Sequence, residues 1–346
     1  MKERIRLALI GCGAVARIHH LPAISRVEAV DLAVLVDPCL ERARELAAKY
    51  RLTRVVRDYR EVTDEVDAAI VATPNYLHAP IAIDLLRRGI HVLVEKPMAL
   101  SSQDCEQMIS AAHENGGVLA VGMEMRFFHP CRFVRQALSK NLLGRIDSFD
   151  LRAGVVSNWP STTDYFLHKK ESGGGVLIHY GVHVLDLLLW WLGDYAEVSY
   201  RDDALGGVEA NCEMKLRLRA GASGTAEISR MRKLRNTCLI EGERGSLEIE
   251  LWDPDGHVYL KHDDDLVLNG YVAADAGAAG QSAPDVFPRQ LVDFVEAIQQ
   301  RRAPFIPGHE ALRAVRLIET CYGSKQALEL PWMTSWADQN GYQRVA

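Results

Sequence analysis

The segment Gly11-Cys12-Gly13-Ala14-Val15-Ala16 directly follows the apolar run Ile5–Ile10. The first glycine permits a tight turn, the second lets the backbone approach a pyrophosphate, and a small third residue lets a helix pack against the strand. The N-terminus of that helix would face the phosphate charge. Any tight turn between a strand and a helix can carry a similar pattern. The strand–turn–helix context nevertheless predicts a dinucleotide site, with cofactor contacts at Gly11, Gly13, Ala14, Val15 and Ala16.

Asp37 ends the next β-rich run, at the place where such sites hold the adenosine ribose. A carboxylate there would accept hydrogen bonds from both ribose hydroxyls and would repel a 2′-phosphate. No basic residue directly follows it, because Pro38 and Cys39 come next. We therefore predict NAD as cofactor, with NADP less favoured. The alternative interpretation is that Asp37 is a turn or capping aspartate before the next helix.

Short β-rich runs alternate with amphipathic helical stretches through residues 5–122, which is typical of a parallel sheet covered on both faces. The expected strands are Ile5–Ile10, Asp31–Val36, Arg54–Val56, Ala68–Ala72, His91–Val94 and Val118–Val121. The expected helices are Leu40–Tyr50, Ala79–Arg88 and one capped by Ser101. The pattern predicts an α/β Rossmann domain over residues 1–122.

After residue 122 the pattern changes. We expect a helix over 131–142, a strand over 147–156 and a helix over 183–192, and then alternating runs between Ala196 and Leu268. That alternation predicts a large open, mainly antiparallel sheet. The Ala/Gly/Ser-rich stretch 272–286 predicts a mobile loop, and helices over 288–300 and 309–327 close the chain. Residues 123–346 are therefore expected to form an α+β substrate domain.

Composition excludes several classes of function. The net charge of −6 offers no basic surface for nucleic acid or acidic lipid. No apolar run reaches the length of a membrane span or resembles a signal sequence. The seven cysteines form no CxxC pair, so neither disulfides nor a metal cluster are expected. We expect a cytoplasmic protein with a small-molecule substrate.

Two later motifs supply groups for chemistry. Thr73-Pro74-Asn75-Tyr76-Leu77-His78 follows the fourth strand at the carboxyl edge, where ligands bind in open α/β sheets. Thr73, Pro74, Asn75 and His78 should therefore line the nicotinamide half, although Asn75 could equally cap the next helix. Lys96 follows the fifth strand, where its ammonium can stabilise a developing alkoxide. His183 can take a hydroxyl proton near neutral pH. The plainer alternatives are a surface lysine and a packed helix histidine.

These motifs occur in order with Glu95-Lys96-Pro97, Arg126-Phe127 and Gly173-Gly174-Gly175 before His183 and Asp186. Together they resemble the Gfo/Idh/MocA oxidoreductase family, and the resemblance extends to Gly308–Leu312 and Leu330–Trp332. The resemblance implies a Rossmann domain followed by a domain whose open sheet makes oligomer contacts, in a homodimer or homotetramer. It also places the family's catalytic lysine at Lys96 and its catalytic histidine at His183.

One position departs from the family pattern. Many members carry an aspartate four residues before the catalytic histidine, and His179 stands there in this chain. We expect His179 to line the substrate pocket as a catalytic and substrate-binding residue, leaving His183 without an anionic partner. His179, His183 and Asp186 have a superficially metal-like spacing. The flanking glycines argue against a continuous helix at His179, and we expect no metal.

The remaining candidates are assigned more loosely. Glu95 would place its loop or touch the nicotinamide ribose. Arg126 would contact substrate or form an interdomain salt bridge, and Asp186 would orient His183 or the substrate, or be buried against the backbone. Trp159, in the aromatic and lysine-rich stretch 157–171, would stack on a sugar ring. The glycine triplet would permit close backbone packing rather than cradle a phosphate, because no strand precedes it and no helix is expected to begin directly after it.

The expected function is NAD(H)-dependent hydride transfer on a sugar, cyclitol, sugar acid or nucleotide sugar. A rival is cofactor-retaining chemistry, in which bound NAD oxidises and then re-reduces a substrate during epimerisation, elimination or glycoside cleavage. A third hypothesis is a ligand-sensing regulator without catalysis, which the presence of both Lys96 and His183 disfavours.

Overall fold

The structure is a computed structural model that describes residues 4–52, 54–62, 65–156, 160, 163–263, 265–272 and 286–328. Trp159, Leu330–Trp332 and nearly all of the predicted loop at 272–286 lie outside the described residues.

The first half forms a parallel sheet with strand order β3-β2-β1-β4-β5-β6. Its strands are β1 (Ile5–Ile10), β2 (Val30–Val36), β3 (Val55–Val56), β4 (Ala68–Val71), β5 (His91–Glu95) and β6 (Leu119–Gly122). The predicted strands are all present, with ends displaced by a single residue. β4 and β6 are buried at every position because helices cover both faces of the sheet. The predicted Rossmann fold is confirmed.

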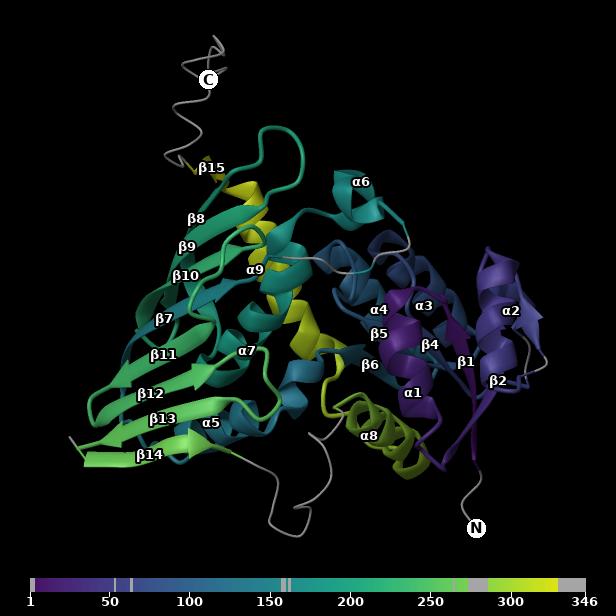
Figure 1. Cartoon of the computed structure of the whole chain (residues 1–346), viewed down its shortest axis with the longest axis horizontal. Helices are drawn as coiled ribbons and strands as arrows, with labels where there is room; N and C mark the ends of the chain where they lie inside the picture. Colours follow the sequence, from purple (N-terminus) through teal and green to yellow (C-terminus); the bar gives the residue numbers. More distant parts are fainter. Residues whose placement is uncertain are drawn as a thin grey trace.

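The two faces have separate helical covers (Figure 1). α3 (His78–Arg87) and α4 (Ser102–Glu114) pack on one face. α1 (Leu21–Ile24), α2 (Leu40–Lys49) and the much later α8 (Val286–Gln300) pack on the other. Leu291, Phe294 and Val295 of α8 belong to the same apolar cluster as Leu9 of β1. The C-terminal part of the chain therefore completes the core of the first sheet.

The second half forms a nine-stranded mixed sheet in the order β14-β13-β12-β11-β7-β10-β9-β8-β15. The strands are β7 (Ile146–Gly154), β8 (Tyr195–Asp202), β9 (Asn211–Leu218), β10 (Ser223–Ser229), β11 (Thr237–Gly242), β12 (Gly245–Glu250), β13 (His257–His262), β14 (Asp265–Tyr271) and β15 (Gln326–Ala327). Only the β7–β10 and β8–β15 pairs are parallel, so the prediction of a mainly antiparallel sheet is confirmed.

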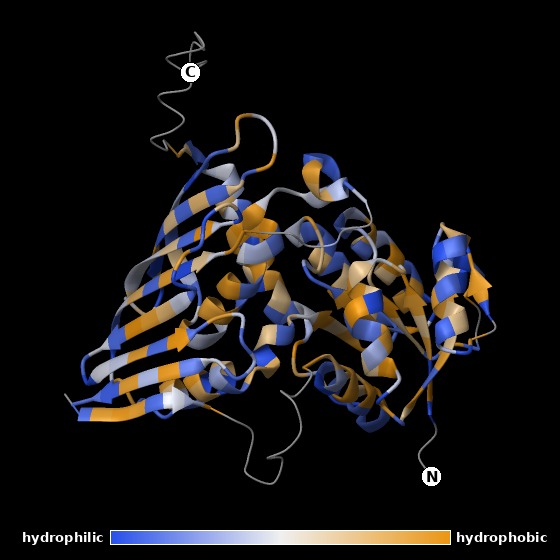
Figure 2. Cartoon of the chain, viewed as in Figure 1, coloured by the Kyte–Doolittle hydropathy of each residue, from blue (hydrophilic) through white to orange (hydrophobic). Residues whose placement is uncertain are grey.

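In the part of the chain that the structure describes, the helices on this sheet lie on one face, namely α5 (His129–Ser139), α7 (Val182–Leu192) and α9 (Gly308–Gly323) (Figure 1). Residues along a strand therefore alternate between core and outside, as the burial of β9 shows. Figure 2 shows hydrophobic and hydrophilic bands that alternate along strands in the middle of this sheet, such as β9. No helix of the described residues covers the other face.

Two expectations about the glycine triplet are wrong. Val176 begins a helix directly after Gly175, and this helix continues through a π-helical turn at Leu177–Gly181 into α7. His179 therefore lies within a continuous helix despite its flanking glycines. The Glu209 carboxylate accepts hydrogen bonds from the backbone N–H groups of Gly175 at 2.8 Å and Leu177 at 2.9 Å. A buried acidic side chain thus caps the helix that the glycine pattern argued against.

The run Lys169–Leu192 is long and apolar enough to cross a membrane, but 78% of its tested window is buried inside the fold. Such burial is typical of a core helix. The four-residue helix α6 (Lys169–Ser172) begins this run. All seven cysteines are unpaired.

Candidate active site

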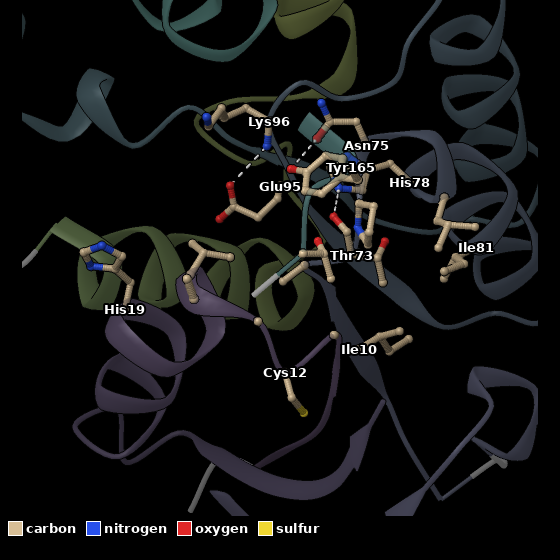
Figure 3. Close-up of a pocket in the computed structure, with 18 of the residues that line it drawn as sticks. Ile10, Cys12, His19, Thr73, Asn75, His78, Ile81, Glu95, Lys96 and Tyr165 are labelled. Carbon is tan, nitrogen blue, oxygen red and sulfur yellow. Dashed lines mark hydrogen bonds between the residues drawn. The ribbon is translucent and has the colours of Figure 1, made fainter. Parts of the chain in front are cut away.

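A cavity of about 1030 Å³ lies between the carboxyl edge of the parallel sheet and the second half of the chain. One side is formed by the glycine turn, Asp37, the Thr73–His78 loop and Glu95-Lys96. The other side includes Glu124, Tyr165, His179, His183, Arg230 and Trp252. In the view of Figure 3, Lys96, Asn75 and Tyr165 lie across the cavity from Cys12 of the glycine turn. Residues from both halves of the chain therefore face one space.

Gly11 has φ +95°, and a Cβ built there would lie 2.4 Å from the Ala72 carbonyl oxygen. No other residue type fits this close approach without moving the backbone. Gly11, Gly13, Ala14 and Val15 line the cavity. Ala16 is fully buried in the core beneath it, so its expected cofactor contact is wrong and its role is helix–sheet packing.

Asp37 lines the cavity, but its carboxylate is already fully engaged. Oδ2 accepts from the Cys12 N–H at 2.8 Å, and Oδ1 accepts from the Cys39 N–H at 2.8 Å. Arg42 adds contacts of 2.7 Å to Oδ1 and 3.3 Å to Oδ2. A carboxylate offers about four lone-pair sites. Ribose hydroxyls can therefore bind Asp37 only when Arg42 moves aside. The sequence analysis considered only Pro38 and Cys39 after Asp37 and so missed that Arg42 competes for this carboxylate.

The Thr73–His78 loop is fastened from several sides. His78 lies with Nδ1 2.8 Å from the Pro97 carbonyl and Nε2 2.9 Å from the Thr73 carbonyl. Because a neutral imidazole has one N–H, only one of these contacts is a hydrogen bond at a time. Asn75 makes no helix-capping bond. Its amide instead donates to the Ser172 carbonyl at 3.0 Å and accepts from the Tyr165 hydroxyl at 3.4 Å. Asn75 thus joins the loop to the second half of the chain.

Glu95 points into the floor of the cavity and is held there by a buried contact of 2.8 Å with Nε2 of His20. His20 ends a π-helical turn at Ala16–His20, which directs its ring toward β5. The Glu95 pKa is lowered because the His20 hydrogen bond and the Lys96 charge outweigh burial, which acts in the opposite direction. Glu95 therefore remains ionised and positions the turn that carries Lys96.

Lys96 reaches across to the second half of the chain. Its Nζ donates a hydrogen bond of 3.0 Å to the backbone carbonyl of His179, within the Leu177–Gly181 π-helical turn. Widened turns of this kind are common at functional sites. The ring of His179 is also at the cavity, 6.2 Å from that of Tyr165. Burial, Lys96 and Arg230 lower the His179 pKa to about 3, so the ring is neutral.

His183 lies one helical turn further and has a partner that the sequence did not suggest. Its Nδ1 is 3.5 Å from a carboxyl oxygen of Glu124. Burial and the neighbouring Lys96 lower the His183 pKa well below its usual value. Burial first, and Glu95 second, raise the pKa of Glu124 to about 8. Both groups are therefore uncharged at neutral pH. The expectation was that His183 lacks an anionic partner, and the protonated Glu124 is an acidic neighbour that becomes anionic only above about pH 8.

Arg126 and Asp186 lie away from the cavity lining and bind each other. Nε and Nη2 of Arg126 each lie 2.7 Å from the Asp186 carboxylate, and Glu310 adds a contact of 3.2 Å. Both side chains of the main pair are 2% exposed. Their expected contact with substrate is therefore wrong. The salt-bridge alternative holds, and it ties the segment after β6 to α7.

Buried polar atoms without hydrogen-bond partners in the described chain concentrate around the cavity. Three of them lie on its walls, namely Thr73 Oγ1, His179 Nε2 and Trp252 Nε1. A fourth, His183 Nδ1, faces the Glu124 carboxyl group at 3.5 Å without forming a hydrogen bond. Native proteins rarely bury such atoms unless a ligand or water satisfies them. Trp252 also has φ +71°, an unusual conformation for this residue type. The cavity is therefore built to receive a polar ligand.

Glu124, Trp252 and Arg230 are among the lining residues that the sequence interpretation missed. Glu124 precedes Arg126-Phe127 without a pattern of its own, and Trp252 and Arg230 lie just beyond the ends of β12 and β10. The sequence Asp-Pro-Asp-Gly directly after Trp252 is typical of a turn, and this was the one sequence feature that could have drawn attention to Trp252. Only the pairing of distant strands brings these three residues to the same cavity.

Comparison with known proteins is consistent with this geometry. Residues 5–123 match the family model described as "Oxidoreductase family, NAD-binding Rossmann fold". Residues 131–248 match the family model described as "GFO/IDH/MocA C-terminal domain". The chain belongs to the Gfo/Idh/MocA oxidoreductase family. The resemblance inferred from the motifs is confirmed.

Individual members of the Gfo/Idh/MocA family show both the breadth of its chemistry and the constancy of its fold. D-glucoside 3-dehydrogenase of Escherichia coli is 31% identical over 55% of this chain and 54% of its own length. A 2,7-anhydro-N-acetylneuraminate hydratase of Mediterraneibacter gnavus is 29% identical over 56% and 54%. The chain spans about half the length of these curated relatives. An oxidoreductase domain protein of Kribbella flavida matches in structure, with TM-score 0.82 and 26% identity over 93% and 97%.

The residues of this Gfo/Idh/MocA member fit the dinucleotide of the family. Gly11 offers a cradle that a Cβ would close, and the backbone of Gly13 faces the same space. The unpartnered Thr73 hydroxyl lies two residues beyond the end of β4 and lines the same cavity. We therefore describe the Rossmann half of the cavity as the NAD site.

Proposed function

We propose that the chain is an NAD(H)-dependent oxidoreductase that interconverts a hydroxyl and a carbonyl group on a polyhydroxylated small molecule. The substrate would be a sugar, cyclitol, sugar acid or nucleotide sugar. NAD, when bound, supplies the hydride acceptor or donor. The observation that carries the proposal is the meeting of Lys96 and His183 from opposite halves of the chain at the cavity of the NAD site.

In this proposal Lys96 and His183 divide the work at the substrate oxygen. The Lys96 ammonium donates a hydrogen bond to that oxygen and stabilises negative charge as it develops. Because Nδ1 of His183 faces Glu124, Nε2 is the nitrogen available to the substrate hydroxyl. The histidine takes the hydroxyl proton during oxidation and returns it during reduction.

Two further residues define where the substrate can lie. Tyr165, hydrogen-bonded to Asn75, provides a ring beside the NAD site. Trp252 packs edge-on against His183, with ring centroids 5.8 Å apart. Its unpartnered indole N–H would donate to a substrate hydroxyl. The expected stacking residue Trp159 stays a prediction, because it lies outside the described residues.

The direct test is turnover with a panel of polyols, sugar acids and nucleotide sugars, following NADH by absorbance. Saturable NADH formation that requires Lys96 would support the proposal. A chain that binds NADH and leaves every member of the panel unchanged, in redox state and in structure, would indicate a ligand-sensing role instead.

A second candidate is cofactor-retaining chemistry, which the hydratase among the relatives favours. In such a reaction the hydride taken from the substrate is returned to it, so no net NADH forms. Glu124, with its pKa near 8, would supply the additional acid or base that an elimination needs. Product analysis by NMR without an absorbance change would identify this reaction.

We also propose association through the open face of the nine-stranded sheet, as a homodimer or homotetramer in the cytoplasm. No helix among the described residues covers this face (Figure 1), and Leu239 lies on it between the inward-facing Cys238 and Ile240. Seven unpaired thiols support a reducing compartment. Sedimentation of Leu239→Lys against the native chain tests the interface, and an unchanged mass would contradict it.

A further inference from the structure

Arg230 brings a guanidinium group to the substrate half of the cavity. It directly follows β10, and its backbone N–H donates to the Ala210 carbonyl at 2.9 Å. Among the residues that the structure describes, its side chain has no hydrogen-bond or ion-pair partner. By contrast, Arg232, two residues further along, is bound to Glu227 at 2.9 Å. One arginine of this loop is thus used by the fold, and the other faces the cavity.

The guanidinium group of Arg230 is held in place without its N–H groups being consumed. Its Cζ lies 5.6 Å from the ring centroid of Phe166, a cation–π contact. Stacking on an aromatic face leaves the N–H groups at the edge of the planar group free to form a fork of hydrogen bonds. Carboxylates and phosphates match that fork.

The charge of Arg230 is not neutralised by the charged groups that surround it among the described residues. Lys96 is a second cation at the cavity, and its ammonium group donates to the backbone carbonyl of His179. The charge of Arg230 helps to lower the pKa of the His179 ring. The acid on this side, Glu124, is protonated at neutral pH, and Glu95 is engaged by His20. The substrate half of the cavity therefore holds two positive charges and lacks a free negative one among the described residues.

We propose that Arg230 forms a subsite for an anionic group, so that the substrate is a polyhydroxylated carboxylate or phosphate rather than a neutral sugar. This inference rests on the proposed function and narrows its substrate class. The anion binds at the Arg230–Phe166 end of the cavity, while the reacting hydroxyl lies at Lys96 and His183. His179 lies between these two ends of the substrate.

The test compares three ligands that share a ring and differ in charge: D-glucose, D-glucuronate and D-glucose 6-phosphate. Each is titrated calorimetrically into the full chain saturated with NADH. We expect at least one anion to bind about 10- to 100-fold more tightly than glucose, the range for a charge-assisted pair. The tighter of the two anions distinguishes a carboxylate subsite from a phosphate subsite.

Variants then assign the preference to one residue. Arg230→Gln should abolish it while leaving NADH binding intact, and Arg230→Lys should retain part of it because charge remains without the fork. Lys233→Gln, which removes an exposed charge from the same loop outside the cavity lining, is the matched control and should change nothing.

The proposal is overturned if glucose binds as tightly as both anions, if neither anion binds at millimolar concentration, or if Arg230→Gln keeps the preference. Failure of the native chain to bind NADH would overturn the proposed function itself, since the titration starts from the NADH complex. The two failures are therefore distinguishable.

Discussion

The carboxyl group of Glu124 lies 3.5 Å from Nδ1 of His183, and the two groups have pKa values displaced in opposite directions. Both are therefore neutral at pH 7. Once Glu124 loses its proton, its carboxylate favours the His183 tautomer with hydrogen on Nδ1, which leaves Nε2 as a proton acceptor. The ionisation of one residue thus controls which nitrogen of the other can act as a base.

We expect the rate of substrate oxidation to rise as the pH passes through about 8, the pKa of Glu124. Glu95 and Asp186 act to raise this pKa, and Lys96 acts to lower it. The rate rises with pH, because only ionised Glu124 favours the His183 tautomer whose Nε2 can accept a proton. Glu124→Gln should remove this limb of the kcat/KM profile. An unchanged profile in the variant would show that the limb belongs to another group.

Lys96 and His183 should be needed for turnover rather than for folding. Lys96→Met and His183→Asn should each lower kcat by ~10²–10⁴, the usual contribution of a positioned acid–base group. NADH affinity, measured by fluorescence, should be retained. Lys140 and His113 are exposed, so Lys140→Met and His113→Asn are matched controls that should keep the native kcat. A His183→Asn enzyme with most of its kcat would move proton transfer elsewhere.

His179→Asp should shift the acid limb of kcat/KM toward higher pH. A carboxylate at this position, near Lys96 and one turn from His183, would stabilise the imidazolium and so raise the His183 pKa. Substrate ranking should change, while NADH binding should stay nearly constant because the dinucleotide contacts lie mainly on the Rossmann half. A variant with the parental profile and ranking would assign His179 to packing alone.

Asp37 and Arg42 should set cofactor preference together. Repulsion between the carboxylate and a 2′-phosphate is worth roughly 1–3 kcal/mol in a partly desolvated site. We expect NADH to bind more tightly than NADPH, and Asp37→Ala to weaken that preference. Arg42→Gln should weaken NADPH binding further, because it removes the cation that contacts Asp37 at the cavity. Equal affinity of the native chain for both cofactors would contradict this prediction.

Arg126 should matter for stability because its charge pair with Asp186 is buried. Arg126→Met leaves the Asp186 carboxylate without its main partner, which typically costs about 3–5 kcal/mol. Arg316→Met breaks an exposed pair with Glu106 and should cost at most about 1 kcal/mol. Urea unfolding of both variants measures the difference in their free energies of unfolding. Similar midpoints would show that the buried pair contributes no more to stability than the exposed pair.

The sequence predicted well whatever depends on local periodicity. The six parallel strands lie within a residue of their predicted places because each is a short apolar run bounded by turn residues. The glycine turn was equally readable, since Gly11 needs a conformation that other residues avoid. Lys96 and His183 were found through their motifs, and the fold brings both to one cavity.

Partners that are distant in sequence or depend on side-chain geometry could not be predicted. The Arg126–Asp186 pair, the His20–Glu95 contact and the Glu124–His183 contact join residues on different elements. Arg42 is only five residues from Asp37, yet its approach requires the first turn of α2. The π-helical turn around His179 leaves no recognisable mark in its residues.

The return of α8 to the first sheet has a consequence for the order in which the protein can fold. A ribosome completes all six parallel strands within the first 122 residues. Leu291, Phe294 and Val295, which help to cover one face of that sheet, are synthesised only after the first eight strands of the second sheet, β7 to β14. The nascent Rossmann half therefore has part of one apolar face uncovered beside α1 and α2 until α8 is made. The final covering of this face is a late event that couples the two halves into one cooperative unit.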